Sequence, residues 1–234
     1  MSDRRPPDAT LIGTASQAGL EALGRLDVPL IVLVGGATGT GKSTVATEVA
    51  HRLGIRRVTS TDVVRQTMRA FFSSEFMPSI HYSSFDAAPS VGEQDPEGDV
   101  VLRGFLDQTR NVLVGVKAVL ARALEEGYSL ALEGVHLVPG MLEPVEGAVF
   151  CQVLLAIEDE NEHAGHFWTR DAEGFRPFEK YLRALPEIRR LQQFLVARAA
   201  KAGVPVIDNV SVEATVDQVV ELVLAEVERV RSPL

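Results

Sequence analysis

The 234-residue sequence has a single cysteine, no long apolar run and fewer basic than acidic side chains. One thiol, Cys151, cannot form a disulfide within the chain, which suits a reducing compartment. No apolar run reaches the roughly 18 residues that a membrane-spanning helix needs. With 23 Lys and Arg against 32 Asp and Glu, the formal net charge is −9, which disfavours binding to nucleic acid or to an anionic membrane. We therefore expect a cytoplasmic protein with no nucleic-acid partner and no membrane partner.

The length and the apolar content, 46% of the residues, predict one domain with a full core. We expect residues 1–28 to form an N-terminal extension, partly disordered or with one short helix, and residues 29–230 to form the domain. Inside it, residues 73–99 are rich in Ser, Pro, Gly and Asp, and residues 158–185 are highly charged. Long connections are usually functional or disordered, so we interpret the first as a substrate-side loop and the second as a lid region.

Short apolar segments alternate with amphipathic helical segments along the chain. Residues 28–36 are almost wholly apolar, as expected of a strand buried on both faces. Residues 99–127 carry apolar side chains at close to a 3.6-residue period, which predicts a long helix. This alternation predicts an α/β fold, a doubly wound five-stranded parallel sheet flanked by helices. The expected strands span residues 28–36, 56–60, 128–134, 149–157 and 204–208.

The strongest motif is the phosphate-binding loop (P-loop) "GGATGTGKST" at residues 35–44, which contains G-x-x-x-x-G-K-S. Glycines let successive backbone N–H groups point at phosphate oxygens, and the next helix offers its positive end to the same anion. In this motif Lys42 reaches the β- and γ-phosphates and the Ser43 hydroxyl ligates Mg²⁺. We therefore predict ATP and Mg²⁺ as cofactors. The predicted nucleotide-binding residues are Gly36, Thr38, Gly39, Thr40, Gly41, Lys42, Ser43 and Thr44.

Triphosphate binding leaves three classes of protein open: a small-molecule kinase, a molecular switch and a work-performing ATPase. The sequence has no N-K-x-D of the kind that reads guanine in G proteins. No apolar run ends in D-E as in motor ATPases, and "AIEDEN" at 156–161 reads instead as the start of a loop.

Asp62 follows the second expected strand, and strand ends meet beside the nucleotide phosphates in a doubly wound sheet. A carboxylate there can orient an attacking hydroxyl or accept its proton. Arg65 and Arg69 follow at spacings that place them on the same helix face, where they could bind an anionic group of the substrate. The alternative is an aspartate that caps the helix, with two solvated arginines.

Two further segments carry candidate site residues. In "SIHYSSFDA" at 79–87, His81, Ser83 and Ser84 can donate to phosphate or carboxylate oxygens, unless the loop is simply solvated. In the lid region, Arg170 and Arg176 could close over transferring phosphates and stabilise their charge, unless they form a solvated surface. We predict Arg170 as a catalytic residue and Arg176 as a nucleotide contact.

Eight segments, in this order, resemble the 2-phosphoglycerate kinase family over roughly residues 29–225. The blocks "EGVH-x-x-PG" and "IR-x-x-Q-x-x-L" are more specific than the P-loop, which very many proteins share. The segments are "GGATGTGKST", "STDVVRQTMR", "SIHYSSFDA", "GFLDQ", "LEGVHLVPG", the "EDENEH" stretch, "IRRLQQFLVARA" and "PVIDN".

The resemblance implies transfer of the ATP γ-phosphate to the 3-hydroxyl of 2-phosphoglycerate, giving 2,3-bisphosphoglycerate. It also implies a P-loop kinase fold with strand order 2-3-1-4-5, an arginine-bearing lid, and an approach of Asn209 to the adenine. Two departures stand out. Only about 28 residues precede the first strand, so we expect the N-terminal module of many archaeal members to be absent. His166 also stands where the family pattern has arginine.

The implied strand order gives a role to the segment "LALEGVHLVPG" at 130–140. The third strand lies beside the first, so Glu133 should emerge next to Lys42 and Ser43. A carboxylate there can hold Mg²⁺ or a metal-bound water, or take the proton of the attacking hydroxyl. Gly134 would leave room for the substrate, and His136 could donate to an anionic oxygen.

We therefore expect an enzyme that phosphorylates a small anionic phosphorylated acceptor, acting as a monomer or homodimer. Two alternatives stay open at this point. One is a kinase for another phosphometabolite or a nucleotide sugar, similar to zeta-toxin kinases. The other is a non-catalytic ATP-binding metabolite sensor. The sequence also leaves open whether Asp62 or Glu133 receives the proton.

Overall fold

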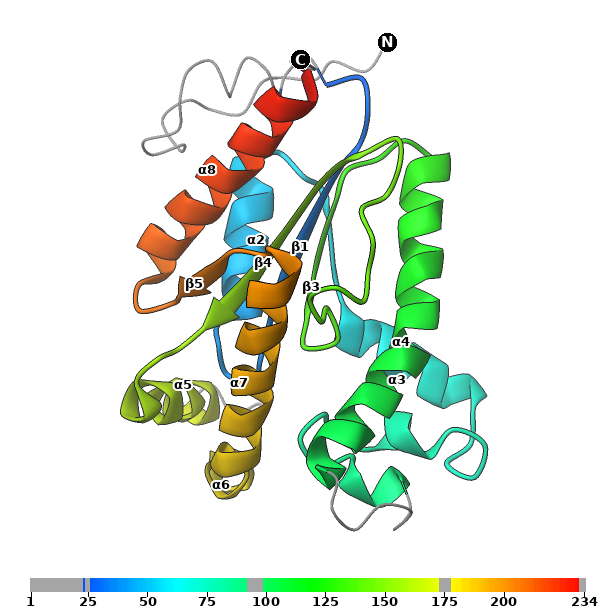
Figure 1. Ribbon diagram of the computed structural model, residues 1–234, viewed down its shortest axis with the longest axis vertical. Helices are drawn as coiled ribbons and strands as arrows, with labels where there is room; N and C mark the ends of the chain where they lie inside the picture. The colour runs from blue at the N-terminus through cyan, green and yellow to red at the C-terminus, as the bar shows by residue number, and fades with distance from the viewer. Residues whose placement is uncertain (1–22, 24–25, 92–98, 173–177, 232–234) are drawn as a thin grey trace.

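A computed structural model of the chain describes residue 23 and residues 26–91, 99–172 and 178–231. Its centre is a five-stranded parallel sheet with the order β2-β3-β1-β4-β5 (Figure 1). This arrangement confirms the predicted fold class and strand order. The strands are β1 (Leu30–Gly36), β2 (Arg57–Ser60), β3 (Leu130–Gly134), β4 (Val149–Ala156) and β5 (Val206–Asp208).

The strand register brings the ends of three strands together. Val34 of β1 pairs with Glu133 of β3, and Glu133 also pairs with Ser60 of β2. The P-loop leaves β1 at Gly36, and the next helix after β2 begins at Thr61. The phosphate loop, the start of that helix and Glu133 therefore lie together at the carboxyl ends of these strands.

Helices cover both faces of the sheet (Figure 1). Even-numbered residues of β1, such as Val32, pack with apolar side chains of α2 and α8, whereas Ile31 and Leu33 pack with α4 on the other face.

Among the described residues, none of the helices combines the length and the apolar content that a membrane span requires. The helices are α2 (Lys42–Arg52), α3 (Thr61–Phe71), α4 (Val100–Glu125), α5 (Glu160–Ala172), α6 (Phe178–Arg183), α7 (Leu185–Ala202) and α8 (Val212–Arg231), with 3-10 turns η2 (Pro78–His81) and η3 (Ala88–Ser90).

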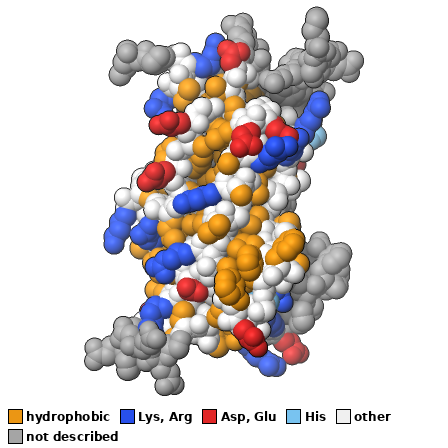
Figure 2. Space-filling model, turned by 90° about the vertical axis from the view of Figure 1, so that its right-hand side faces the viewer, with side chains coloured by type: hydrophobic (Ala, Val, Ile, Leu, Met, Phe, Trp, Pro, Cys, Tyr) orange, Lys and Arg blue, Asp and Glu red, His pale blue; other side chains and the backbone are white. Residues whose placement is uncertain are grey.

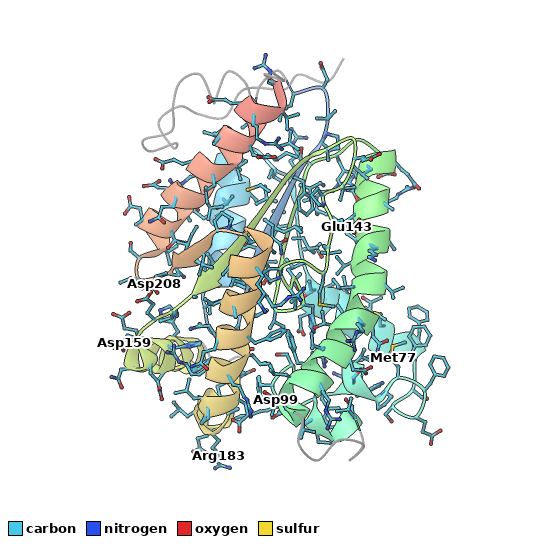
Figure 3. All side chains as sticks on the ribbon, viewed as in Figure 1. Met77, Asp99, Glu143, Asp159, Arg183 and Asp208 are labelled. Atoms are coloured by element: carbon cyan, nitrogen blue, oxygen red, sulfur yellow. The ribbon has the colours of Figure 1, made fainter. Side chains whose placement is uncertain are left out.

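The charged stretch at 158–185, which we call the lid after its predicted role, contains two helices, α5 and α6, where the sequence suggested a loop at its start. The reason is local: the Asp159 carboxylate accepts from the backbone N–H groups of Asn161 and Glu162 at 2.8 and 2.9 Å. Such a cap satisfies N–H groups that the first helical turn leaves without a partner. Asp159 lies at the start of α5 in Figure 3.

Exposed phenylalanines gather at the end of α3. Phe71 and Phe76 are 80% and 72% exposed, and the Phe72 ring stacks on Phe76 at 5.7 Å. Figure 2 shows hydrophobic side chains on this side of the molecule. Asp62 begins the same helix, so these rings lie at the opposite end of α3 from the candidate site.

Candidate active site

The P-loop adopts a glycine-dependent conformation at the start of α2. Gly39 and Gly41 have φ values of 89° and 79°, in the left-handed region that favours glycine. A Cβ at Gly41 would also lie 2.3 Å from Nδ2 of Asn209. The Lys42 ammonium is buried and donates to the backbone oxygen of Ala37 at 2.6 Å. The loop is therefore held in a curled form, with its lysine folded over it.

The structure places the remaining predicted loop residues around this turn. Thr40 is buried and donates from its hydroxyl to Ala37, whereas Thr44 is exposed in α2. The resemblance implied that Asn209 approaches the adenine. In the structure Asn209 is buried and donates from Nδ2 to the backbone oxygen of Thr40 at 3.0 Å. Its observed contact is thus with the loop backbone.

Ser43 and Glu133 meet in the structure, as the strand order predicts. The Ser43 hydroxyl donates to Oε1 of Glu133 at 2.9 Å. A hydroxyl and a carboxylate at this distance form a pair of hard oxygen donors of the kind that Mg²⁺ prefers. The described residues contain no cluster of three or more His, Cys, Asp or Glu side chains that could hold a metal. A metal at this pair would therefore take its other ligands from the nucleotide or from water.

Asp62 and Arg65 form an ion pair at the start of α3. Oδ1 of Asp62 accepts from both Nε and Nη2 of Arg65, at 3.0 and 2.7 Å. The helix cap is Ser60, whose hydroxyl oxygen accepts from the Val63 N–H at 3.1 Å. The N-cap alternative for Asp62 therefore does not hold, because another side chain already fills that position.

Arg65 has a different set of contacts from the one predicted. Its Nη1 donates to the backbone oxygens of Ile80 and Tyr82, at 2.8 and 3.0 Å, and its side chain is 9% exposed. The guanidinium thus fixes residues 79–86, which we call the acceptor loop after its predicted role, relative to Asp62. Arg69 is exposed on the next turn and donates to Gln66 at 3.1 Å.

The structure corrects the expectation for His136. The ring is 1% exposed, Nδ1 lies 2.9 Å from Oγ1 of Thr61, and Nε2 lies 2.9 Å from Oε1 of Gln108. Both nitrogens therefore have protein partners, which leaves neither for a substrate oxygen. Burial, followed by the positive charge of Arg65, lowers the pKa of His136 to about 3.

Gln108 is one residue of this site that the sequence did not single out. Its amide nitrogen donates to the backbone oxygens of Ser79 and Tyr82, at 2.6 and 3.0 Å, so its oxygen must be the group that faces His136. Nε2 of His136 then carries the proton, and Nδ1 accepts from Thr61. The available signal was the "GFLDQ" block, in which a polar residue falls on the buried face of a long helix.

Three predicted acceptor-loop residues occupy different environments. His81 uses Nε2 to contact the backbone oxygen of Phe72 at 3.0 Å, so part of its ring is occupied at the end of α3. All three line the cavity described below, and Ser84 is buried.

The lid helix α5 contacts the P-loop through two histidines. Nε2 of His163 lies 2.8 Å from the backbone oxygen of Thr38, and Nδ1 of His166 lies 3.0 Å from that of Gly39. Carbonyl oxygens only accept, so both ring nitrogens carry protons. Burial lowers the pKa of His163 to about 4. His166 thus contacts the loop backbone through Nδ1.

A row of aromatic rings continues from this helix to the acceptor loop. Phe167 stacks between His163 and Tyr181, at centroid distances of 5.5 and 5.3 Å. Tyr181 meets Phe85 edge-on at 5.8 Å. The side chain of Arg170 and all of Arg176, the two predicted lid arginines, lie outside the described residues.

The "IR-x-x-Q" block fixes the root of the lid. Arg189 donates to the backbone oxygens of Ile157 and Glu158, at 2.6 and 2.8 Å. Gln192 binds both the N–H and the backbone oxygen of Ile157, at 3.1 and 2.8 Å. Helix α7 therefore holds the segment that leads from β4 into α5.

One cavity of about 1040 Å³ joins these parts. It is bounded by the P-loop, the start of α3, the acceptor loop, the end of β3 and the lid helix α6. Lys42, Asp62 and Glu133 all line it, together with Lys180 and Tyr181. A phosphate donor on one wall and a small acceptor on the other would share this space.

The strand order, the P-loop and the cavity beside it define a P-loop kinase fold. A crystal structure of a protein from Thermus thermophilus has this fold, with a TM-score of 0.50 at 20% identity over 86% of this chain and 98% of that one. The chain itself belongs to the 2-phosphoglycerate kinase family.

Three curated relatives carry that family assignment. A 2-phosphoglycerate kinase from Thermococcus kodakarensis is 42% identical over 206 residues, which are 88% of this chain and 70% of the relative. Those from Methanothermobacter thermautotrophicus and Methanopyrus kandleri are 43% and 41% identical, over 82% and 83% of this chain. The chain spans only 65% and 61% of the length of these two relatives. No protein-family model matches the chain.

Proposed function

We propose that this protein transfers the γ-phosphate of ATP to the hydroxyl of 2-phosphoglycerate, giving 2,3-bisphosphoglycerate. The observation that carries the proposal is one cavity that the P-loop and the acceptor loop share, in a member of this family. A molecular switch or a motor ATPase has no second substrate, so it does not need polar side chains that face the phosphates from the other side of the cavity. We also propose that residues 29–230 form one domain and that the protein works in the cytoplasm.

The nucleotide is bound by the P-loop backbone, by Lys42 and by Ser43. Peptide N–H groups and the ammonium supply positive charge where the triphosphate is negative. Ser43 and Glu133, which lie 2.9 Å apart, would hold Mg²⁺. When bound, Mg²⁺ would neutralise charge on the phosphate oxygens. Arg170 and Arg176 of the lid would add positive charge over the same phosphates.

Asp62 is the proposed base. Arg65 fixes its Oδ1, so the carboxylate has a defined orientation beside the cavity. The acceptor hydroxyl gives its proton to Asp62 as its oxygen forms the new bond to the γ-phosphorus. The bond from that phosphorus to the bridging oxygen of ADP breaks, and ADP leaves with the electron pair.

The acceptor loop binds the acceptor. Ser83 and Ser84 present hydroxyl donors along the cavity, and Arg69 on α3 adds a positive charge on the same side. Arg65, Gln108 and His136 act indirectly, because their hydrogen bonds hold this loop in place.

A coupled assay for ADP release tests the proposal, with 2-phosphoglycerate, 3-phosphoglycerate, glycerate and a panel of phosphosugars as acceptors. We expect 2-phosphoglycerate to give the highest kcat/KM and mass spectrometry to identify the bisphosphorylated product. Lys42→Ala should abolish turnover and leave the circular dichroism spectrum unchanged. ATP binding without ADP release for any acceptor would contradict a catalytic function and favour a metabolite sensor.

A further inference from the structure

Lys180 is a cavity-lining cation that the sequence did not single out. It lies on α6, the second lid helix, and its ammonium contacts the acceptor loop at two points. Nζ donates to Oγ of Ser83 at 3.0 Å and pairs with Oδ2 of Asp86 at 3.1 Å. It also lies 5.4 Å from the ring centroid of Phe85. The side chain is half exposed, and Lys180 lines the same cavity as Asp62 and Glu133.

The other lysine and arginine side chains that line the cavity, Lys42, Arg65 and Arg69, each contact a neighbouring part of the chain. Lys42 donates to the P-loop, and Arg65 uses Nε, Nη1 and Nη2 to bind Asp62 and the acceptor loop. Arg69, on the α3 side, contacts Gln66 of its own helix. Among the described residues of the lid, Lys180 is therefore the basic side chain that lines this cavity.

The direction of the Ser83 contact shows how a ligand could use this site. An ammonium only donates hydrogen bonds, so Ser83 accepts from Lys180 through its oxygen. The Ser83 hydroxyl proton is then directed to a different acceptor. The ammonium itself has three N–H groups, of which one donates to Ser83, while the Asp86 carboxylate pairs with the charge. An anionic oxygen beside the pair could accept a hydrogen bond from each residue. Both bonds would be charge-assisted and therefore strong.

We propose that Lys180, together with Ser83, binds the anionic group of the acceptor and so determines which acceptors are used. The inference rests on the proposed function, because it assigns a residue to the acceptor side of that site. The group bound is a phosphate or a carboxylate. Asp86 opposes binding of the anion, because its carboxylate lies beside the same ammonium.

A competing explanation makes Lys180 a simple tether between lid and loop. The two explanations predict opposite behaviour for Asp86→Asn. If the ion pair only tethers, Lys180→Met and Asp86→Asn both break it and both raise the acceptor KM. If Lys180 binds the anion, Lys180→Met raises the acceptor KM, whereas Asp86→Asn lowers it or leaves it unchanged.

The experiment compares KM for 2-phosphoglycerate and for ATP in the wild type and in these variants of the full chain. Loss of a charge-assisted hydrogen bond should raise the acceptor KM of Lys180→Met by about 10- to 100-fold, with little change in the ATP KM. Lys180→Arg should recover part of the loss. Arg183→Met is the matched control, because Arg183 lies on the same helix, points away from the body in Figure 3 and does not line this cavity. Equal increases in Lys180→Met and Asp86→Asn would overturn the proposal.

Binding measurements separate this inference from the proposed function. Titration calorimetry with 2-phosphoglycerate and with glycerate, in the presence of a non-hydrolysable ATP analogue, needs no turnover. A larger loss for 2-phosphoglycerate than for glycerate in Lys180→Met identifies the phosphate as the bound group, and equal losses identify the carboxylate. Binding without turnover in the wild type would refute only the proposed function. Equal affinities of wild type and Lys180→Met, or no acceptor binding by the wild type, would refute the inference.

Discussion

Asp62 and Glu133 both line the cavity, but their partners differ. Asp62 pairs with a guanidinium that fixes its orientation, whereas Glu133 accepts from the hydroxyl expected to bind the metal. On this difference in partners we propose Asp62 as the base and Glu133 as the metal ligand, the two roles between which the sequence could not choose.

Asp62→Asn should therefore lower kcat by about 100- to 10,000-fold with little change in KM, because the proton acceptor is lost while the amide oxygen can still accept from Arg65. Glu133→Gln should instead raise the Mg²⁺ concentration needed for half-maximal activity. Steady-state kinetics across a Mg²⁺ titration measure both effects. A Mg²⁺ requirement shifted by Asp62→Asn, with kcat reduced mainly by Glu133→Gln, would reverse the two roles.

His136 makes a prediction about stability and pH. Its pKa is about 3 in the folded chain, whereas an exposed histidine has a pKa near 6.5. The unfolded chain therefore binds a proton between these values that the folded chain does not, and stability falls as the pH drops below about 6.5. The slope approaches about 1.4 kcal/mol per pH unit for this one residue. His163, with a folded pKa of about 4, acts in the same direction.

His136→Gln should flatten this dependence while lowering stability at pH 7, because the contacts to Thr61 and Gln108 change. Urea unfolding at pH 7, 6 and 5 gives the slopes. His51→Gln, at an exposed position near the end of α2, is the control and should keep the wild-type slope. The same slope in His136→Gln and the wild type would contradict a buried neutral ring.

At the level of the site, the sequence predicted backbone-encoded features better than side-chain partners. Glycine spacing identifies a P-loop, and strand order then places Glu133 near Ser43. The partners of His136 could not be predicted in the same way, because Gln108 approaches it only once α4 packs on the sheet. The sequence around a histidine does not show whether its ring binds a ligand or the amide of a buried glutamine.

At the scale of elements, the predicted strands exist, but some ends differ for local reasons. The fifth strand begins at Val206, although the apolar pattern starts at Val204. The N–H of Val204 donates to the backbone oxygen of Ala199 at 3.0 Å, and Gly203 ends α7 with a φ of 66°. Val204, which the apolar pattern assigned to the strand, thus completes the cap of α7. Likewise, the acidic start of the lid forms a helix because Asp159 caps it.

Helix α4 and η3 approach so closely that only glycine fits between them. A Cβ at Gly104 would lie 2.3 Å from the backbone oxygen of Ala87. Gly104→Ala should therefore destabilise the fold by about 1–3 kcal/mol, although alanine favours helices. Gly165→Ala in α5 is the matched control, since nothing lies within 4 Å of its added Cβ, and it should stabilise by up to about 1 kcal/mol. Thermal unfolding distinguishes the two, and equal shifts would contradict the close contact.

On the scale of the whole molecule, the row of rings connects the P-loop to the acceptor loop through both lid helices. Its central member is Tyr181, which touches Phe167 on one side and Phe85 on the other. We expect the acceptor to raise the affinity for a non-hydrolysable ATP analogue by on the order of 5- to 150-fold, and Tyr181→Ala to remove most of this effect. Calorimetry with and without acceptor measures the ratio. Tyr128→Ala, which removes a ring stacked with Arg57, should leave the ratio unchanged. An unchanged ratio in Tyr181→Ala would show that the ring row does not couple the two sites.

The contact between lid and P-loop also has a thermodynamic consequence. Coupling between two binding sites is reciprocal, so ATP must tighten acceptor binding by the same factor as the acceptor tightens ATP binding. His163 and Phe167 at one end of the row, and Phe85 at the other, would then be stabilised together by either ligand. When both ligands are scarce, occupancy of the complete site follows the product of the two concentrations. The fraction of protein with a complete site would therefore rise when ATP and the acceptor increase together, and only weakly when one of them increases alone.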